Sequence, residues 1–330
     1  MVLGMEPSEM TTDVLIIGAG MAGLSAALEL QRAGRSVRVL DKGRGVGGRL
    51  ASRRMGEASF DHGAQFITTS DPRFGSALEG WRQTGVVEEW CRGFEEHADG
   101  HPRWRGKPSM NSVAKHLAKD LDVRLGQQVL ALRCWHDQWR VETNMGELYS
   151  ANAVVLTPPV PQSLALLEAG GFSLSPEMRS RLAAIEYERC LAVMAMLDRP
   201  SRLPPPGGLA PGKGPIAWIA DNQMKGISAV PAVTIHATHT FSLEHWDGDR
   251  QASGRLLLKA AAAWVGAGIK TFQVHGWRYS KPMRVLEQAC VIVSQSPMLV
   301  LAGDAFAGPK VEGAALSGWA AANAILKSKL

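Results

Sequence analysis

A glycine-rich turn between a strand and a helix, in residues 13–33, constrains the fold more than any other part of this chain. Residues 14–17 form a continuous apolar run, as expected for a parallel strand buried on both faces. Gly18, Gly20 and Gly23 follow in the pattern G-x-G-x-x-G. The first glycine allows a tight turn, the second lets the backbone approach a pyrophosphate, and the third lets the helix pack against the strand. We therefore expect a Rossmann-like unit that binds a dinucleotide.

The residues after this turn add detail to the nucleotide site. The expected helix, residues 21–33, begins at Met21 and Ala22, where free N–H groups and the positive end of the helix dipole favour an anion. Asp41 ends the next expected strand, residues 36–40, about twenty residues past the glycines. A carboxylate at this spacing can accept hydrogen bonds from an adenosine ribose.

Composition excludes several other classes of protein. The 330 residues are 45% hydrophobic and 20% charged, with a net charge of +5, and no basic block carries the interleaved aromatics typical of nucleic-acid binding. The four cysteines show no C-x-x-C pattern and no histidine at metal-ligand spacing, so we expect free thiols and no metal. No apolar run has transmembrane length, and residues 1–10 lack the pattern of a signal peptide. We expect a short disordered leader, no membrane contact, a monomer and a cytoplasmic location.

The order of expected elements indicates a nucleotide-binding domain that is interrupted in sequence. Antiparallel strands are expected in the middle of the chain, at 190–197, 217–220, 233–240 and 272–278, with a helix at 252–265. Residues 104–108 are expected to form a loop. The predicted nucleotide-binding domain comprises residues 1–80, 109–160 and 282–330. The predicted substrate domain comprises residues 81–108 and 161–281.

Three further motifs connect the chain to a known family. They are Gly47-Gly48-Arg49, Gly303-Asp304 after a late apolar strand, and Val311-Glu312-Gly313-Ala314-Ala315 at the start of the last expected helix. Together with the first turn, they resemble the FAD-dependent amine oxidase superfamily. The resemblance implies an α/β fold, in which a Rossmann-like FAD-binding domain of the glutathione-reductase type carries an inserted mixed β-sheet substrate domain.

The same resemblance assigns residues to the cofactor. Asp304 would hold the ribityl chain or phosphate, Val129 would meet adenine through its backbone, and the N–H groups of residues 311–313 would face the flavin N1 and C2 carbonyl, where a helix dipole stabilises negative charge. Because residues 303–313 contain no Cys or His, we expect non-covalent FAD. The implied FAD contacts are Gly18, Gly20, Met21, Ala22, Gly23, Asp41, Lys42, Gly48, Arg49, His62, Gly63, Ala64, Gln65, Phe66, Val129, Thr157, Gly303, Asp304, Val311, Glu312, Gly313 and Ala314.

Within the superfamily, the chain resembles the renalases, especially the bacterial ones. The segments that carry this likeness are residues 61–66, 102–110, 220–226 and 275–279. Bacterial renalases usually read N-x-x-K-P-G-R where this chain has Asn222-Gln223-Met224-Lys225-Gly226-Ile227, so the proline and arginine are missing. The likeness implies oxidation of 2- and 6-dihydro isomers of NAD(P)H by hydride transfer to flavin N5, with electrons passed to oxygen or another acceptor.

Five residues are our candidates for the substrate pocket: Asn222, His236, His239, Arg278 and Tyr279. Arg278 could pair with a substrate phosphate or carboxamide. The sequence contains no convincing acid–base dyad, and hydride transfer needs none, because it depends on stacking and orienting two flat rings.

Three alternatives stay open. One is an amine oxidase acting on a primary amine or polyamine, another is a desaturase or isomerase of carotenoid or porphyrin type, and the third is a flavin-binding protein without turnover. The sequence leaves open the preferred isomer, NAD versus NADP, and the electron acceptor.

Overall fold

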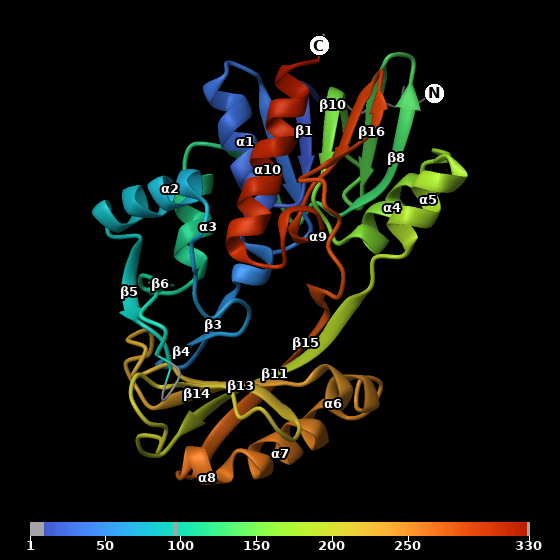
Figure 1. The fold of residues 1–330 in the computed structure, drawn as a ribbon. Helices are drawn as coiled ribbons and strands as arrows, with labels where there is room; N and C mark the ends of the chain where they lie inside the picture. Colours follow the sequence, from blue (N-terminus) through green and yellow to red (C-terminus); the bar gives the residue numbers. More distant parts are fainter. Residues whose placement is uncertain (1–9, 95–97, 329–330) are drawn as a thin grey trace, which may run out of the picture. The chain divides into compact units, whose positions relative to one another are not determined.

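The chain divides into two compact units. The structure, a computed structural model, describes residues 10–94 and 98–328, and the expected leader at residues 1–9 lies outside them. Unit 1 comprises residues 1–48, 114–186 and 282–330, and unit 2 comprises residues 49–113 and 187–281 (Figure 1). Compared with the predicted domain boundaries, residues 49–80 and 109–113 fall in unit 2 and residues 161–186 fall in unit 1.

Unit 1 is built on an eight-stranded sheet with the order β16-β17-β10-β1-β2-β7, extended by the β8–β9 hairpin beside β10. Strand β1 pairs in parallel with both β10 and β2, β17 is parallel to β10, and β7 is parallel to β2. The strands are β1 (Met10–Ile17), β2 (Val37–Asp41), β7 (Asp122–Leu125), β8 (Val129–Trp135), β9 (Gln138–Thr143), β10 (Leu148–Leu156), β16 (Val291–Gln295) and β17 (Met298–Leu301). The helices are α1 (Met21–Arg32), α3 (Asn111–Ala118, which begins in unit 2), α4 (Val160–Ala169), α5 (Pro176–Ala183), α9 (Asp304–Ala307) and α10 (Val311–Leu326).

The apolar runs of the sequence form the central strands of unit 1. Residues 14–16 of β1 and 153–156 of β10 have no exposed surface, which is why these parts of the two strands are apolar at every position rather than at alternate ones. Helix α10 packs directly on α1, as Figure 1 shows. A side chain at Gly318 would collide with the carbonyl oxygen of Ala22, so glycine is needed for this close approach.

Unit 2 contains a five-stranded sheet with the order β12-β13-β14-β11-β15 and two separate hairpins, β3–β4 and β5–β6. The strands are β3 (Ser52–Met55), β4 (Ala58–Asp61), β5 (Val87–Cys91), β6 (Arg103–Gly106), β11 (Tyr187–Leu197), β12 (Gly208–Leu209), β13 (Ile216–Asp221), β14 (Ala232–Ala237) and β15 (Ile269–Pro282). The helices are α2 (Pro72–Gln83), α6 (His239–Glu244), α7 (Arg250–Ala260) and α8 (Ala262–Val265), and a short 3-10 helix spans Gly48–Leu50.

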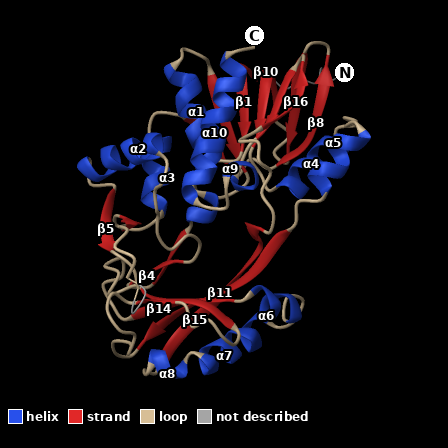
Figure 2. Ribbon diagram, in the orientation of Figure 1, coloured by secondary structure: helices blue, strands red, loops and turns tan. Residues whose placement is uncertain are grey.

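The two faces of this sheet have different coverings. Helices α6, α7 and α8 lie along one face, as Figure 2 shows, and bury alternate residues such as Leu191, Val193 and Ile235. On the other face, Phe60 of the β3–β4 hairpin packs with Met194. Because side chains alternate along a strand, Thr234 and His236 of β14 and Gln273 and His275 of β15 belong to the second face.

Several local expectations are corrected by this arrangement. Residues 104–108, expected to be a loop, include most of β6, which pairs with β5. The single helix expected at 252–265 is two helices, α7 and α8. These errors share a cause, since a short strand in a hairpin and a break between helices depend on partners that a local pattern does not reveal. No helix in the described part of the chain is long and apolar enough to cross a membrane.

Candidate functional site

The glycine turn of unit 1 has the shape that a diphosphate needs. Gly18 has a positive φ of 107°, and a side chain there would collide with Thr157 Oγ1. Gly23 lies so close to the carbonyl oxygen of Gly18 that a Cβ would clash with it. At Gly20, by contrast, a Cβ would meet nothing within 4 Å. Neither the backbone conformation nor packing requires glycine at this position, so we infer that space is kept there for a ligand.

The end of α1 at this turn is also suited to an anion. Gly20 caps the helix without a side-chain hydrogen bond, and the first turn, which contains Met21 and Ala22, has no acidic residue. Its N–H groups and helix dipole are therefore available to phosphate oxygens. Thr157 donates from Oγ1 to the carbonyl of Ile17 at 2.8 Å and so holds β10 against the turn.

Asp41 is fixed at the end of β2 by backbone donors. Its Oδ2 accepts from Ala19 N and its Oδ1 from Gly43 N, both at 2.6 Å. A carboxylate can accept about four hydrogen bonds, so capacity remains for ribose hydroxyls. The next residue, Lys42, is exposed and reaches Gln162 Oε1 at 3.3 Å.

The late motif forms a second helix end in unit 1. Gly303 has a φ of 146° and donates from its backbone to Ser317 Oγ at 2.8 Å. Asp304 follows as the first residue of α9 and is buried. Helix α10 then begins at Val311 without a side-chain cap, and Glu312 is buried in its first turn.

The residues next to Val129 include a group that sequence reasoning missed. Val129 is buried at the start of β8, and Gln127, two residues earlier, has a buried Oε1 with no hydrogen-bond partner among the described residues. An unpaired buried acceptor costs about 1–3 kcal/mol, so it is expected where a ligand donor completes the site. The adjacent Gln127-Gln128 turn was the only sequence signal.

The remaining predicted FAD contacts, Arg49 and residues 62–66, lie in unit 2. Arg49 donates to the carbonyls of Tyr279 and Ser280 at 3.4 and 3.3 Å. A side chain at Gly63 would collide with the carbonyl of Arg49, so the two backbone segments touch. The amide of Gln65 donates to the carbonyl of Asp61 at 2.7 Å. These bonds hold the segment in one conformation.

A buried ion pair anchors this segment. Lys225 Nζ lies 2.8 Å from Asp61 Oδ2, and neither side chain has exposed surface. Asp61 Oδ1 also accepts from Ser52 Oγ at 2.6 Å and from Met110 N at 2.9 Å. The Lys225 ammonium lies 5.1 Å from the centre of the Trp90 ring. The pair thus ties the turn after β13 to the residue just before His62.

His62 lies in a cluster of flat rings on the second face of the sheet. Its ring stacks on Trp277, with centroids 5.2 Å and planes 19° apart, and meets His275 edge-on at 4.9 Å. The carbonyl of His62 accepts from Trp277 Nε1 at 2.8 Å, and His236 Nε2 lies 3.1 Å from the same oxygen. Nδ1 of His62 is buried and has no partner among the described residues.

The histidines of this cluster are neutral at pH 7. Burial lowers the pKa of His62 from 6.5 to about 3, helped by His275 and Arg53. Burial also lowers the pKa of His236 to about 4 and that of His275 below its usual value. Since a carbonyl only accepts, neutral His236 carries its proton on Nε2 and donates it to His62.

The structure separates the five predicted substrate residues. Asn222 is fully buried and donates to Thr234 Oγ1 at 3.0 Å, and its Oδ1 has no partner among the described atoms. Nδ1 of His239 accepts from the backbone of Arg189 at 2.9 Å, while the ring of Tyr279 packs on Tyr187 at 5.5 Å.

Two of the predicted substrate residues occupy different faces of the sheet. His236 belongs to the cluster around His62, described above. Arg278 is exposed, and its alternation with Trp277 places it on the helix-covered face.

Four residues of unit 2 that shape this region were absent from the sequence-based candidates: Arg53, Lys225, His275 and Trp277. His275 and Trp277 are two positions apart on β15, and this period-2 spacing could have predicted that they lie on the same face of the sheet. Lys225 gave no such signal, because its partner is 164 residues away in the chain.

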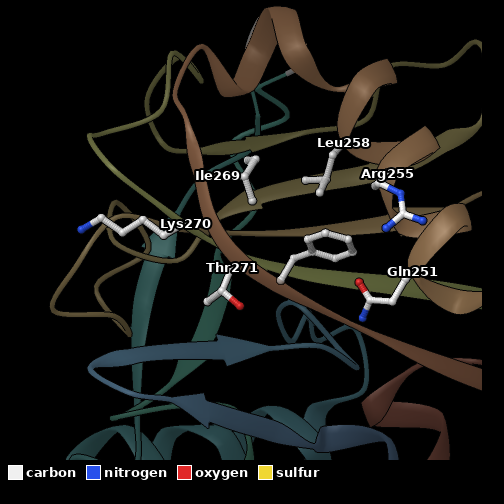
Figure 3. Close-up of a pocket in the computed structure, with 7 residues that line it drawn as sticks. Gln251, Arg255, Leu258, Ile269, Lys270 and Thr271 are labelled. Carbon is white, nitrogen blue, oxygen red and sulfur yellow. The ribbon is translucent and has the colours of Figure 1, made fainter.

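A pocket of about 410 Å³ lies elsewhere in unit 2, on the helix-covered face. Figure 3 shows Gln251 and Arg255 of α7 opposite Ile269 and Thr271 of β15. It is lined by none of the predicted site residues.

Comparison with known proteins gives the chain its family. Residues 90–326 match the model of flavin-containing amine oxidoreductases, and residues 16–79 match that of NAD(P)-binding Rossmann-like domains. The chain belongs to the flavin-containing amine oxidoreductase family. It is therefore an FAD-dependent oxidoreductase, and the glycine turn, Asp41 and the uncapped helix ends of unit 1 fit that cofactor.

Individual relatives agree with this assignment. The chain is similar to renalase from Mus musculus, with 24% identity over 89% of this chain and 92% of the relative. It is also similar to protoporphyrinogen oxidase 2 of Arabidopsis thaliana, with 38% identity over only 20% of this chain and 13% of the relative. In fold, it resembles wild-type putrescine oxidase bound to putrescine, with a TM-score of 0.71 and 13% identity over 96% of this chain and 99% of that one.

Proposed function

We propose that this flavoprotein oxidises isomeric dihydronicotinamide dinucleotides, the 2- or 6-dihydro forms of NAD(P)H, to NAD(P)+. When bound, non-covalently, FAD would supply the acceptor for one hydride, and the two electrons would then leave to oxygen, giving hydrogen peroxide, or to another acceptor. The similarity to a renalase over most of the chain supports this proposal. The observation that carries it is the charge of the second face of the unit 2 sheet.

Arg53 on that face forms no ion pair with a described carboxylate, and the histidine rings beside it are neutral. The two carboxylates Asp61 and Glu188 are each paired with a lysine, Lys225 and Lys281. Arg53 lies close enough to His62 and His275 to lower the pKa of both rings. Such surroundings repel the ammonium group of an amine substrate and attract the negative charge of a dinucleotide. We therefore favour the dinucleotide over an amine.

The ring cluster provides what a hydride donor needs from the protein. Trp277 and His62 present flat surfaces held in place by the bonds to the His62 carbonyl. The imidazoles are neutral, so they add no charge that would oppose the positive nicotinamide product. We assign substrate orientation and water exclusion to this cluster, and we expect no acid–base residue to be required.

The test is anaerobic reduction of the bound flavin. The purified holoenzyme is mixed with a preparation of 2- and 6-dihydroNAD, and its visible flavin absorbance is followed. Ordinary NADH and putrescine serve as the two controls. Rapid bleaching by the isomers alone is the expected result. Bleaching by putrescine alone would instead identify an amine oxidase, and no bleaching by any compound would favour a flavin-binding protein without turnover.

A further inference from the structure

Three arginines lie on the helix-covered face of the unit 2 sheet. Arg189 of β11 is two residues before Leu191, which packs against the helices, so the alternation of the strand places both on this face. Arg278 of β15 follows Trp277, which belongs to the ring cluster, and so points to the opposite face. Arg250 comes to this face from the first turn of α7, one of the helices that Figure 2 shows along the sheet.

The pairing of β11 with β15 brings Arg189 close to Arg278. Two backbone hydrogen bonds join the opposite ends of the strands: Asp198 N to Gly268 O at 3.0 Å and Met283 N to Glu186 O at 2.8 Å. These bonds make the two strands antiparallel and place Arg189 opposite residues 277–280 of β15. In that range, Arg278 and Ser280 share the face of Arg189. Arg278 is therefore directly opposite Arg189 or diagonal to it, with Cβ atoms within about 8 Å.

A buried tryptophan adds Arg250 to this group. The guanidinium carbons of Arg250 and Arg189 lie 4.5 and 4.9 Å from the centre of the Trp246 ring. A guanidinium over an aromatic ring uses its flat surface, so the N–H groups in its plane stay free to donate. Gly276 leaves the room for this contact, because its Cβ would lie 3.1 Å from Trp246 and 3.2 Å from Arg250 Nη2. We call Arg189, Arg250 and Arg278 the arginine triad.

The arginine triad has no counter-ion in the described part of the chain. None of its side-chain N–H groups donates to a described acceptor, and Nη1 of Arg250 is buried without a partner. The adjacent Asp249 caps α7 through Gln251 N and Ala252 N at 2.9 and 3.2 Å, and its ion pair is with Arg255. Three like charges at short range repel one another, and a partly buried charge without an acceptor costs free energy. A bound anion would relieve both costs.

We propose that the arginine triad binds an anion that carries phosphate groups. The planar fork of arginine can donate two parallel hydrogen bonds to phosphate oxygens, and three such forks suit an anion of more than one charge. The arginine triad lies on the face opposite His275 and Trp277, so this anion and a molecule on the ring cluster occupy separate sites. The inference goes beyond the proposed function and does not depend on it.

Calorimetric titration of the FAD-loaded protein with pyrophosphate tests the arginine triad. In this form of the protein, the flavin keeps its own diphosphate site occupied. Arg250→Gln and Arg278→Gln should each raise the Kd for pyrophosphate about tenfold, the loss expected for one charge-assisted contact. Arg278 is exposed, so its variant keeps the test available if Arg250→Gln does not fold.

Two control variants locate the site. Arg255→Gln removes an exposed arginine of α7 that pairs with Asp249 and lies outside the arginine triad. Arg53→Gln removes an arginine of the other face, where it donates to Gln273 Oε1 at 3.2 Å. Both variants should bind pyrophosphate as the unmodified protein does. Weaker binding by Arg53→Gln, with unchanged binding by the two variants of the arginine triad, would place the anion on the other face and overturn the proposal.

A parallel titration with inorganic phosphate distinguishes two kinds of ligand. Weaker phosphate binding in Arg250→Gln and Arg278→Gln, with or without weaker pyrophosphate binding, assigns the arginine triad to a single phosphate group. Weaker binding of pyrophosphate alone assigns it to a diphosphate. Unchanged Kd values for both anions in the folded variants, or no binding of either anion by the unmodified protein, would contradict the proposal.

Discussion

At the residue scale, the buried charges of Asp61 and Lys225 in unit 2 compensate each other in an ion pair, without contact with solvent. Asp61 and Lys225 have no exposed surface, and three donors satisfy the carboxylate. Burial lowers the pKa of Lys225, while Asp61 opposes that shift. A buried pair of this kind adds little net stability over apolar residues, but removal of one partner leaves an uncompensated charge. We infer that its value is to fix the segment that carries His62.

Loss of one partner should therefore be worse than loss of both. Lys225→Met should destabilise the protein by about 3–5 kcal/mol, because Asp61 stays buried and unpaired. Asp61→Asn with Lys225→Met should recover a large part of that loss. Urea unfolding of the single and double variants measures the difference. Equal midpoints for Lys225→Met and the unmodified protein would show that the pair is not buried as described.

The neutral histidines predict how stability depends on pH. His62 and His236 have pKa values of about 3 and 4 when folded and 6.5 when unfolded. Below pH 6.5, the unfolded state takes up protons that the folded state excludes, so the free energy of unfolding decreases as the pH is lowered. The contribution of His236 is lost down to about pH 4 and that of His62 down to about pH 3. Each histidine can contribute up to about 1.4 kcal/mol per pH unit in this window.

Replacement of one histidine should reduce this slope. His236→Gln keeps a donor for the His62 carbonyl and cannot titrate, so its stability should fall less steeply below pH 6.5. Urea midpoints at several pH values measure the slope, and His136→Gln on the exposed β8–β9 turn is the matched control. The same slope in His236→Gln and the control would contradict the burial of His236.

At the element scale, the glycines of unit 1 are of two kinds: some are required for close packing of helices, and one leaves space for a ligand. Gly23 and Gly318 allow α1 to contact the turn and α10, and a side chain at either would strike a backbone oxygen. Gly20 is different, since a Cβ there meets no protein atom. Its φ of −83° is also available to any residue. The absence of a side chain at Gly20 therefore serves the ligand and not the fold.

Gly20→Ala should separate cofactor binding from folding. We expect a loss of FAD affinity of about tenfold or more, because the methyl group occupies space beside the pyrophosphate. The unfolding midpoint of the apoprotein should stay unchanged. Gly80→Ala on α2 is the control, because its Cβ also meets open space but lies far from the turn in sequence. Full FAD occupancy in Gly20→Ala would contradict this interpretation.

At the scale of the whole molecule, the chain passes repeatedly between its two units, at residues 48–49, 113–114, 186–187 and 281–282. Neither unit is therefore a continuous segment. The predicted FAD contacts are also divided, with Arg49 and residues 62–66 in unit 2 and the others in unit 1.

Acid precipitation of the whole protein tests how the flavin is held. Residues 303–313 offer no cysteine or histidine for a covalent bond, so yellow colour should remain in the supernatant and the pellet should be colourless. Yellow colour in the washed pellet would show a covalent link elsewhere. Absorbance of the two fractions is the measurement.

The sequence by itself determined the nucleotide half of this protein. The fold class and the family are confirmed, because the strand, the glycines and Asp41 lie within one short segment whose spacing alone implies their contacts. Residues 14–17 of β1 and 153–156 of β10 are apolar and buried at every position, and such runs can be recognised without knowing their partners.

Only the tertiary structure decided the second half of the site. The contacts of Lys225 with Asp61, of Trp277 with His62, and of Arg53 with Gln273 join residues more than 160 positions apart. No local period or spacing encodes such pairs. They arise when the sheet of unit 2 brings β15 and the β3–β4 hairpin together, and burial among those elements then makes the histidines neutral.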